Sequence, residues 1–240
     1  MDDNSVRGQM IDDTFAVDAL ASCPLFEHAN RQMLESLAKS LRRRRFRRNE
    51  VIFHQGDSGD SLHVVATGAV KILLPSTEGD EAIIATLRPG DFFGELALLD
   101  GSTRSATAAA LEPSETLVLP RPVLMELLGT VPGLGDALLV GLARELRRLT
   151  SQVEELHFLD LAGRLAMRLS RLAQESQPDA SGQISLPWPY TQSDLAAMIG
   201  GTRQSVNRLL AELVDEGLIQ IQPDALVIRD LDELARRAER

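Results

Sequence analysis

The chain has 240 residues, of which 44% are hydrophobic, so it is long enough for two domains of ordinary size with packed cores. Its formal net charge is -10 at pH 7, which opposes nonspecific attraction of the whole molecule to nucleic acid. No uninterrupted apolar run approaches membrane-spanning length, and the aspartate-rich amino terminus lacks the basic start and apolar core of a secretion signal. We therefore expect a cytoplasmic protein.

Cysteine and histidine usage argues against a metal or redox centre. Cys23 is the only cysteine, which excludes an internal disulfide and a thiolate-held iron–sulfur cluster within one chain. The four histidines stand at spacings that suggest no metal site, and we expect each to lie at the surface or to be a satisfied core residue: His28, His54, His63 and His157. No metal, haem or iron–sulfur cofactor is expected, although Cys23 or a histidine has the chemistry of an axial haem ligand.

The amino-terminal half reads as a short helical region followed by strands. Residues 1–19 are expected to form a flexible acidic extension, and residues 20–41 have helical spacing with an early turn at Pro24. Residues 43–120 carry short Val/Ile/Leu segments separated by Gly/Asp turns, which is typical of antiparallel strands. This pattern predicts a jelly-roll-like β-barrel.

Residues 42–48 contain six arginines around Phe46. Clustered arginines can neutralise phosphates, which permits a nucleic-acid interpretation. Alternating exposed arginines on a strand explain the run equally well, and it is far in sequence from a better DNA-binding candidate described below. We therefore interpret it as an exposed strand of the β-rich region.

Residues 93–107 are the most informative stretch, because they place a carboxylate, a guanidinium and a hydroxyl around a Gly-led turn. Gly94 permits close backbone approach to a ligand, and the residues after it can open a short helix whose N–H groups favour an anion. Arg104 can form a forked, charge-assisted pair with phosphate oxygens, and Ser105 adds a donor. Glu95 is acceptor-only when ionised, so it suits a sugar hydroxyl.

From Pro132 the hydrophobic period changes to alternating three- and four-residue steps, the seam of a left-handed coiled coil. Two such helices would pack in parallel as a dimer, whereas the alternative is an amphipathic helix buried on its own domain. The seam residues are Leu139, Leu142, Leu146, Leu149, Val153 and Leu156. Thr150 and Ser151 then occupy positions e and f, and Thr150 flanks the interface.

Residues 192–210 have the pattern of a helix-turn-helix. Ala196 allows close packing, Gly200 supplies the turn, and Thr202 is a natural N-cap of the second helix. The apolar residues expected in the shared core are Leu195, Ile199, Val206 and Leu209. Residues 217–222 and 226–228 flank a Pro-Asp-Ala turn and predict a β-hairpin, the wing of a winged helix.

The amino-terminal side chains of a recognition helix reach base edges in the major groove. Arg203 can bond guanine O6 and N7 in a forked pair, and Gln204 can pair with adenine N6 and N7. Arg208 lies further along the same face. Ser205 and Asn207 suit phosphate or water-mediated contacts.

Several of these segments resemble one known family. Residues 93–107 look like the phosphate-binding cassette of cyclic-nucleotide-binding domains, and residues 49–65 and 67–72 resemble the strands and turn of the same domain. Residues 158–166 resemble the hinge after the dimer helix of Crp/Fnr transcription factors. The resemblance covers roughly residues 20–240 and implies an α+β fold.

The resemblance implies a domain order and a set of site residues. Its domains would be a cyclic-nucleotide-binding barrel at 20–131, a dimerisation helix at 132–160 and a winged-helix domain at 161–240, with a boundary near Asp160. Carried onto this sequence, the ligand site comprises Gly94, Glu95, Leu96, Ala97, Arg104, Ser105, Thr150 and Ser151. The DNA-binding residues are Thr202, Arg203, Gln204, Ser205, Asn207 and Arg208.

The implied function is a homodimeric DNA-binding regulator under allosteric control by a cyclic nucleotide, with cyclic AMP (cAMP) as the favoured effector. Cyclic GMP, a cyclic dinucleotide or a ligand-independent mode stay open, because residues 149–151 match the family only loosely. The best-known relatives carry an acidic residue where this chain has Gln204, so the operator stays open too. RNA polymerase is an expected partner, and residues 177–180 lie where family activators carry a polymerase-contacting loop.

A regulatory subunit of a signalling enzyme, or an enzyme itself, is the alternative from another class. The sequence offers no nucleophile with a plausible histidine partner, no Walker loop and no kinase motif. A kinase regulatory subunit would have no use for a winged helix. We therefore predict a regulator and not an enzyme.

Overall fold

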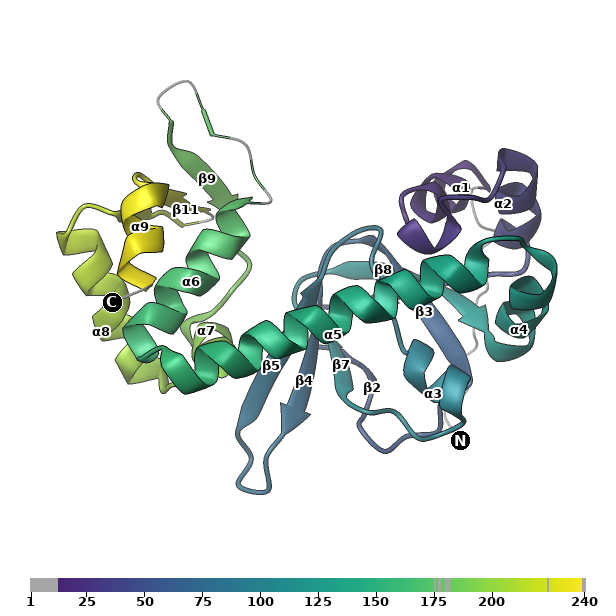
Figure 1. Ribbon diagram of the computed structural model, residues 1–240, viewed down its shortest axis with the longest axis horizontal. Coiled ribbons are helices and arrows are strands. Elements are labelled where there is room, and N and C mark those ends of the chain that lie inside the picture. The colour runs from purple at the N-terminus through teal and green to yellow at the C-terminus, as the bar shows by residue number, and fades with distance from the viewer. Residues whose placement is uncertain (1–12, 175, 177, 180–181, 224, 239–240) are drawn as a thin grey trace. The chain divides into compact units, whose positions relative to one another are not determined.

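The computed structural model describes residues 13–174, 176, 178–179, 182–223 and 225–238 (Figure 1). These residues fall into two compact units. The first comprises the described chain up to Pro75 together with Ile84–Leu146, and the second comprises Ser76–Ile83 and the described chain from Arg147 onward.

Two four-stranded sheets form the body of the first unit, in the orders β1-β8-β3-β6 and β2-β7-β4-β5. Both sheets contribute to one core cluster, with Phe46 and Phe93 from one sheet and Ile52 and Val70 from the other. This arrangement confirms the predicted α+β class and its jelly-roll-like antiparallel sheets. The strands are β1 (Arg42–Phe46), β2 (Val51–Phe53), β3 (Ser61–Thr67), β4 (Val70–Pro75), β5 (Glu81–Leu87), β6 (Phe92–Phe93), β7 (Thr107–Ala110) and β8 (Ser114–Pro120).

The arginine run forms the edge strand β1, which pairs antiparallel with β8. Arg43 and Arg45 both form ion pairs with Glu115 on β8, the latter at 2.7 Å. The guanidinium of Arg44 lies 5.0 Å from the ring of Phe46. The prediction that this run forms a strand is confirmed.

The amino-terminal helices correct one prediction. Helix α1 (Asp13–Ala21) places Ala16, Val17 and Leu20 in the core with β8, so residues 13–19 are not a flexible extension. The apolar side chains share one helical face, which burial stabilises despite the acidic neighbours. The earlier part of the predicted extension lies outside the described residues. The helices that follow are η1 (Pro24–Phe26), α2 (Arg31–Ala38) and α4 (Arg121–Thr130).

Cys23 lies between α1 and η1, with 1% of its surface exposed. Burial raises the pKa of its thiol to about 12. The side chain is therefore a core residue.

The helix expected over residues 132–160 is α5, which runs from Leu134 to Phe158 (Figure 1). Leu134 and Leu138 pack in the core of the first unit. Four seam residues are more than half exposed, namely Leu139, Leu146, Val153 and Leu156, while Leu142 and Leu149 are half-buried. An exposed apolar stripe therefore extends along this helix, and the predicted dimer is one way to cover it.

Within the described residues, no single helix is long and apolar enough to cross a membrane. Helices α4 and α5 together reach the length and composition of a span, but they are bent by 115° at their junction. Leu124 of α4 and Leu134 of α5 belong to the same buried cluster.

Helices and a small sheet of order β10-β11-β9 form the described part of the second unit. Asp160 accepts a hydrogen bond from the Gly163 amide at 2.7 Å and so caps the start of α6. The predicted hairpin is confirmed as β10 and β11, whereas β9 was not predicted; Asp224 in the hairpin turn lies outside the described residues. The elements are α6 (Leu161–Gln174), β9 (Ile184–Pro187), α7 (Gln192–Ile199), α8 (Arg203–Asp215), β10 (Ile219–Ile221), β11 (Ala225–Ile228) and α9 (Leu231–Ala238).

Candidate functional site

The Gly-led turn predicted from the sequence is present at the start of α3 (Glu95–Asp100). Gly94 is the N-cap of this helix and has a left-handed conformation with φ of 84°. A Cβ added there would lie 2.5 Å from Nη1 of Arg104, so no other residue fits without displacing the guanidinium. Ala97 on α3 is buried and Leu96 is exposed.

Arg104 is the buried charge of this site, with 4% of its surface exposed. Its Nη1 donates to the Gly94 carbonyl at 2.7 Å and its Nη2 to the Ser61 carbonyl at 2.8 Å. The guanidinium carbon lies 4.2 Å from the centre of the Phe53 ring. Among the described residues, Nε of Arg104 has no hydrogen-bond partner. The structure brings Gly94 and Arg104 into contact and leaves one buried donor unpaired.

Glu95 is half-buried, and Ser105 is exposed. Burial raises the pKa of Glu95, and the carboxylate of Glu145 on α5 raises it further, while Arg104 lowers it. The Ser105 carbonyl accepts a hydrogen bond from the side-chain amide of Gln55 at 3.2 Å. A carboxylate, a guanidinium and a hydroxyl thus lie in one unit of the structure, as the sequence predicts.

The loop after β2 supports this site, and its part was not predicted from individual residues. The Gly56 amide donates to the Arg104 carbonyl at 2.9 Å, and the Arg104 amide donates to the Asp57 carbonyl at 2.8 Å. A Cβ added at Gly59 would lie 2.3 Å from Cβ of Ala97, so this loop approaches α3 closely. The Gly-rich sequence of residues 56–60 was the available signal.

Thr150 and Ser151 lie on α5 beyond the division between the two units, where Thr150 is exposed and Ser151 half-buried. Their place in the effector site stays a prediction.

No metal-binding arrangement accompanies the site: within the part of the chain that the structure describes, no three His, Cys, Asp or Glu side chains are grouped to hold an ion. His63 is a core residue, as expected, with Nδ1 3.1 Å from Oγ1 of Thr116.

The second candidate site is the helix-turn-helix formed by α7 and α8. The Thr191 side chain accepts from the Asp194 amide at 3.0 Å and the Asp194 carboxylate accepts from the Thr191 amide at 2.9 Å, which fixes the start of α7. Gly200 ends α7 in a left-handed conformation with φ of 68°, as the predicted turn requires. The predicted core residues Leu195, Ile199, Val206 and Leu209 are all buried.

The start of α8 presents polar side chains to solvent. Thr202 accepts from the Ser205 amide at 3.1 Å, which confirms the predicted N-cap. Ser205 is half-buried, and its hydroxyl lies 2.9 Å from that of Thr202. Arg203 is exposed and donates from Nε to the side-chain oxygen of Gln192 at 3.4 Å. The other exposed residues of the predicted set are Gln204, Asn207 and Arg208.

Comparison with known families agrees with both sites. Residues 43–130 match the cyclic nucleotide-binding domain family, and residues 163–237 match the Crp-like helix-turn-helix domain family. The first match contains Gly94 and Arg104, and the second contains α7, α8 and the wing.

Three similar proteins illustrate the range of relatives. The CRP-like cAMP-activated global transcriptional regulator of Mycobacterium tuberculosis is 31% identical over 92% of this chain and 99% of its own length. The cyclic AMP receptor protein of Thermus thermophilus is 32% identical over 88% of this chain and 96% of its own. A solved structure of CLP, a c-di-GMP responsive global regulator of Xanthomonas campestris, aligns with a TM-score of 0.69 and 25% identity, covering 80% of this chain and 95% of that one.

Proposed function

Because the chain belongs to the Crp/Fnr family of transcription regulators, we propose that it is a homodimer whose binding to a pseudo-palindromic operator is controlled by cAMP. It is a regulator and not an enzyme. The observation that supports an anionic effector is the unpaired Nε of buried Arg104 beside Gly94. A buried donor without a partner is costly, and a phosphodiester oxygen would satisfy it.

In the proposed complex, Arg104 and Ser105 donate to the cyclic phosphate and Glu95 accepts from the ribose hydroxyl. Thr150 and Ser151 would reach the base from α5. The cAMP-activated regulator of M. tuberculosis and the cyclic AMP receptor protein of T. thermophilus support cAMP as the effector. The c-di-GMP responsive regulator CLP supports a cyclic dinucleotide as the second candidate.

The proposed DNA contact places α8 in the major groove. Arg203 would bond guanine and Gln204 a second base, with Arg208 further along the helix and Asn207 and Ser205 near the phosphates. The exposure of Arg203 and Gln204 supports this assignment. In a dimer, two such helices would lie about 34 Å apart, one turn of DNA.

The exposed seam of α5 supports dimerisation, since Leu146 and Leu139 are 67% and 64% exposed. Effector binding would be coupled to operator affinity by about 1–3 kcal/mol, a several-fold to hundredfold change. We place the regulator in the cytoplasm, with RNA polymerase as a partner. The loop proposed for that contact includes Gln177 and Ala180, which lie outside the described residues.

Calorimetry of the full chain with cAMP, cyclic GMP and c-di-GMP tests the effector. We expect cAMP to bind most tightly and to raise affinity for an operator selected from a random library. Tighter binding of c-di-GMP than of cAMP would identify the cyclic dinucleotide as the effector instead. Operator binding that none of the three changes would contradict allosteric control by a cyclic nucleotide.

A further inference from the structure

The guanidinium of Arg104 is already fixed in the protein alone. It bridges the Gly94 carbonyl before α3 and the Ser61 carbonyl at the start of β3, at 2.7 and 2.8 Å. These two bonds use Nη1 and Nη2 and leave Nε unpaired. The side chain therefore meets a ligand in a fixed position, with its Nε–H group available.

This guanidinium lies over an aromatic ring. Phe53, on β2, has its ring centre 4.2 Å from Cζ of Arg104, within the range of a cation–π contact. Burial lowers the pKa of Arg104, while the carboxylates of Asp60, Glu95 and Asp57 raise it. A buried cation gains most from an aromatic face, because water does not compete for its charge.

Phe53 is itself held by two neighbouring rings. His63 lies 5.9 Å away edge to face, Phe93 lies 5.8 Å away, and these two rings stack on each other at 5.0 Å. Burial, with Arg104 and Arg44 nearby, lowers the pKa of His63 to about 3. The imidazole is therefore neutral at pH 7 and adds no positive charge beside Arg104.

We propose that Phe53 is a positioning residue of the effector site: its ring holds the Arg104 guanidinium against Gly94 and Ser61, so that Nε is ready for a phosphodiester oxygen. The inference rests on the proposed binding of a cyclic nucleotide. A side chain fixed before binding loses less conformational freedom when the ligand arrives, which raises affinity.

A double-mutant cycle separates this role from simple packing. Phe53→Leu should weaken cAMP binding about 3- to 10-fold in calorimetry, and Phe53→Tyr, which keeps an aromatic face, should restore most of it. In an Arg104→Leu background the same Phe53→Leu change should have less than about a 2-fold effect, because no cation remains above the ring. An equal loss in both backgrounds would overturn the proposal.

Phe46→Leu is the matched control, since Phe46 shares the core cluster of Phe53 but lies beside Arg44 instead of Arg104. It should leave cAMP affinity within about 2-fold of the original chain. A loss equal to that of Phe53→Leu would mean that general loosening of the core explains both. If Phe53→Leu fails to fold, Phe53→Met takes its place in the cycle.

A measurement without ligand tests the contact directly. In the NMR spectrum of the unliganded chain, the ring current of Phe53 should shift the Arg104 side-chain protons upfield, and Phe53→Leu should abolish that shift while Phe53→Tyr keeps it. Binding of cAMP with no such shift would overturn the positioning role alone. Failure of the original chain to bind any cyclic nucleotide would overturn the proposed function, and the role in binding with it.

Discussion

The consequence of replacing Arg104 depends on its burial. Arg104→Leu removes a charge-assisted donor from a site with almost no access to water, which should cost about 1.5–3 kcal/mol of effector binding. We expect cAMP affinity to fall about 10-fold or more in calorimetry. Arg31→Leu, which removes an exposed ion pair with Glu35, is the control and should leave cAMP affinity unchanged. Unchanged affinity in Arg104→Leu would refute the proposed pose.

His63 predicts a dependence of stability on pH. Its pKa is lowered from 6.5 to about 3. Between these two pH values, His63 binds a proton in the unfolded chain but not in the folded chain. Its contribution to stability is complete above pH 6.5 and is lost as the pH falls toward 3, by about 1.4 kcal/mol per pH unit. Denaturant titrations at pH 7, 6 and 5 should therefore show a shallower decline for His63→Phe than for the original chain.

A His63→Phe profile parallel to that of the original chain would show that the buried imidazole accepts its proton in the folded state.

For individual residues, the sequence predicted that Gly94 and Arg104 lie in one site. It did not predict that the ring of Phe53 packs against the Arg104 guanidinium. Ten positions separate Gly94 and Arg104, and the Gly-led turn with its short helix is a local pattern. Phe53 reaches Arg104 only because β2 and β7 pair in one sheet. The spacing of residues in the sequence does not show which aromatic ring a guanidinium from a distant segment will contact.

Among the elements, α5 offers the clearest test. Leu146 is 67% exposed on the predicted seam, and Leu146→Asp would bury two like charges in a dimer, at a cost of several kcal/mol. Sedimentation should then show monomers.

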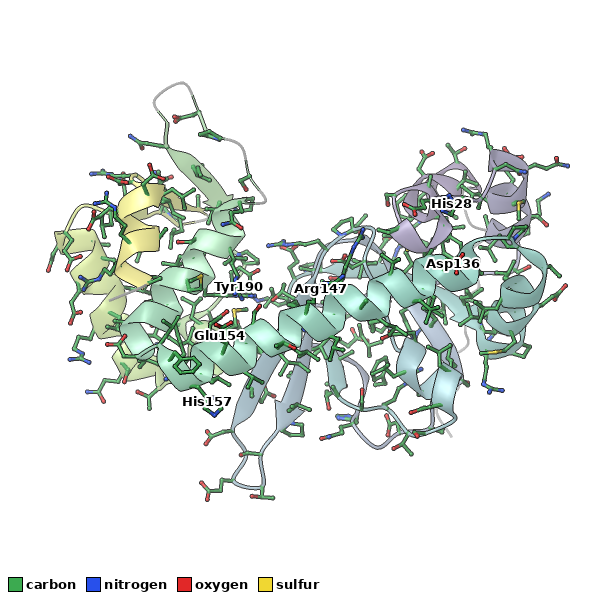
Figure 2. The ribbon with its side chains drawn as sticks, viewed as in Figure 1. His28, Asp136, Arg147, Glu154, His157 and Tyr190 are labelled. Atoms are coloured by element: carbon green, nitrogen blue, oxygen red, sulfur yellow. The ribbon has the colours of Figure 1, made fainter. Side chains whose placement is uncertain are left out.

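Arg147→Asp is the matched control, because Arg147, labelled on α5 in Figure 2, is the next residue after Leu146. The alternating three- and four-residue steps of the seam do not include it. Arg147→Asp introduces the same carboxylate and should leave the dimer intact. Dimers of Leu146→Asp would show that the interface lies elsewhere.

Elements with local signals were predictable, and elements that depend on distant packing were not. The α7–α8 turn followed from Gly200 and Thr202, whose backbone roles are set by neighbours in sequence. Helix α1 was not predicted because its segment contains acidic residues, and its apolar face is recognisable only from its packing against β8. Strand β9 was missed because it is four residues long and pairs with β11, from which two helices and a strand separate it along the chain.

Considered as a whole, a chain of net charge -10 must bind DNA through a small number of local contacts. Arg203→Ala would delete one bidentate guanine contact per half-site, at about 1–3 kcal/mol each. Specific binding in a gel-shift assay should drop about 30-fold or more, with nonspecific binding little changed.

Arg236→Ala is the control, since Arg236 lies on α9 and pairs with Glu233. It should leave specific affinity unchanged. Equal losses of specific and nonspecific affinity in Arg203→Ala would assign Arg203 to the phosphates instead of a base.

The operator itself reports on Gln204. Gln204→Glu turns a donor and acceptor into an acceptor only, so preference at one symmetric position should move toward a base pair that offers the cytosine N4 donor. Selection from a random operator library at fixed salt should show one altered column per half-site. Identical motifs from both proteins would show that Gln204 does not read a base. The sequence preference would then depend on Arg208 or on DNA deformability.

The burial of Cys23 makes this regulator convenient for labelling. With a pKa of about 12, roughly one thiol in ten thousand is ionised at pH 8, and the side chain is closed to reagents as well. Purification then needs no reductant, and a dimer cannot come from oxidative cross-linking of this thiol. A cysteine introduced at an exposed position such as Ser105 or Gln204 would be the one reactive thiol in the chain, so a spin label or fluorophore would attach there without first removing Cys23.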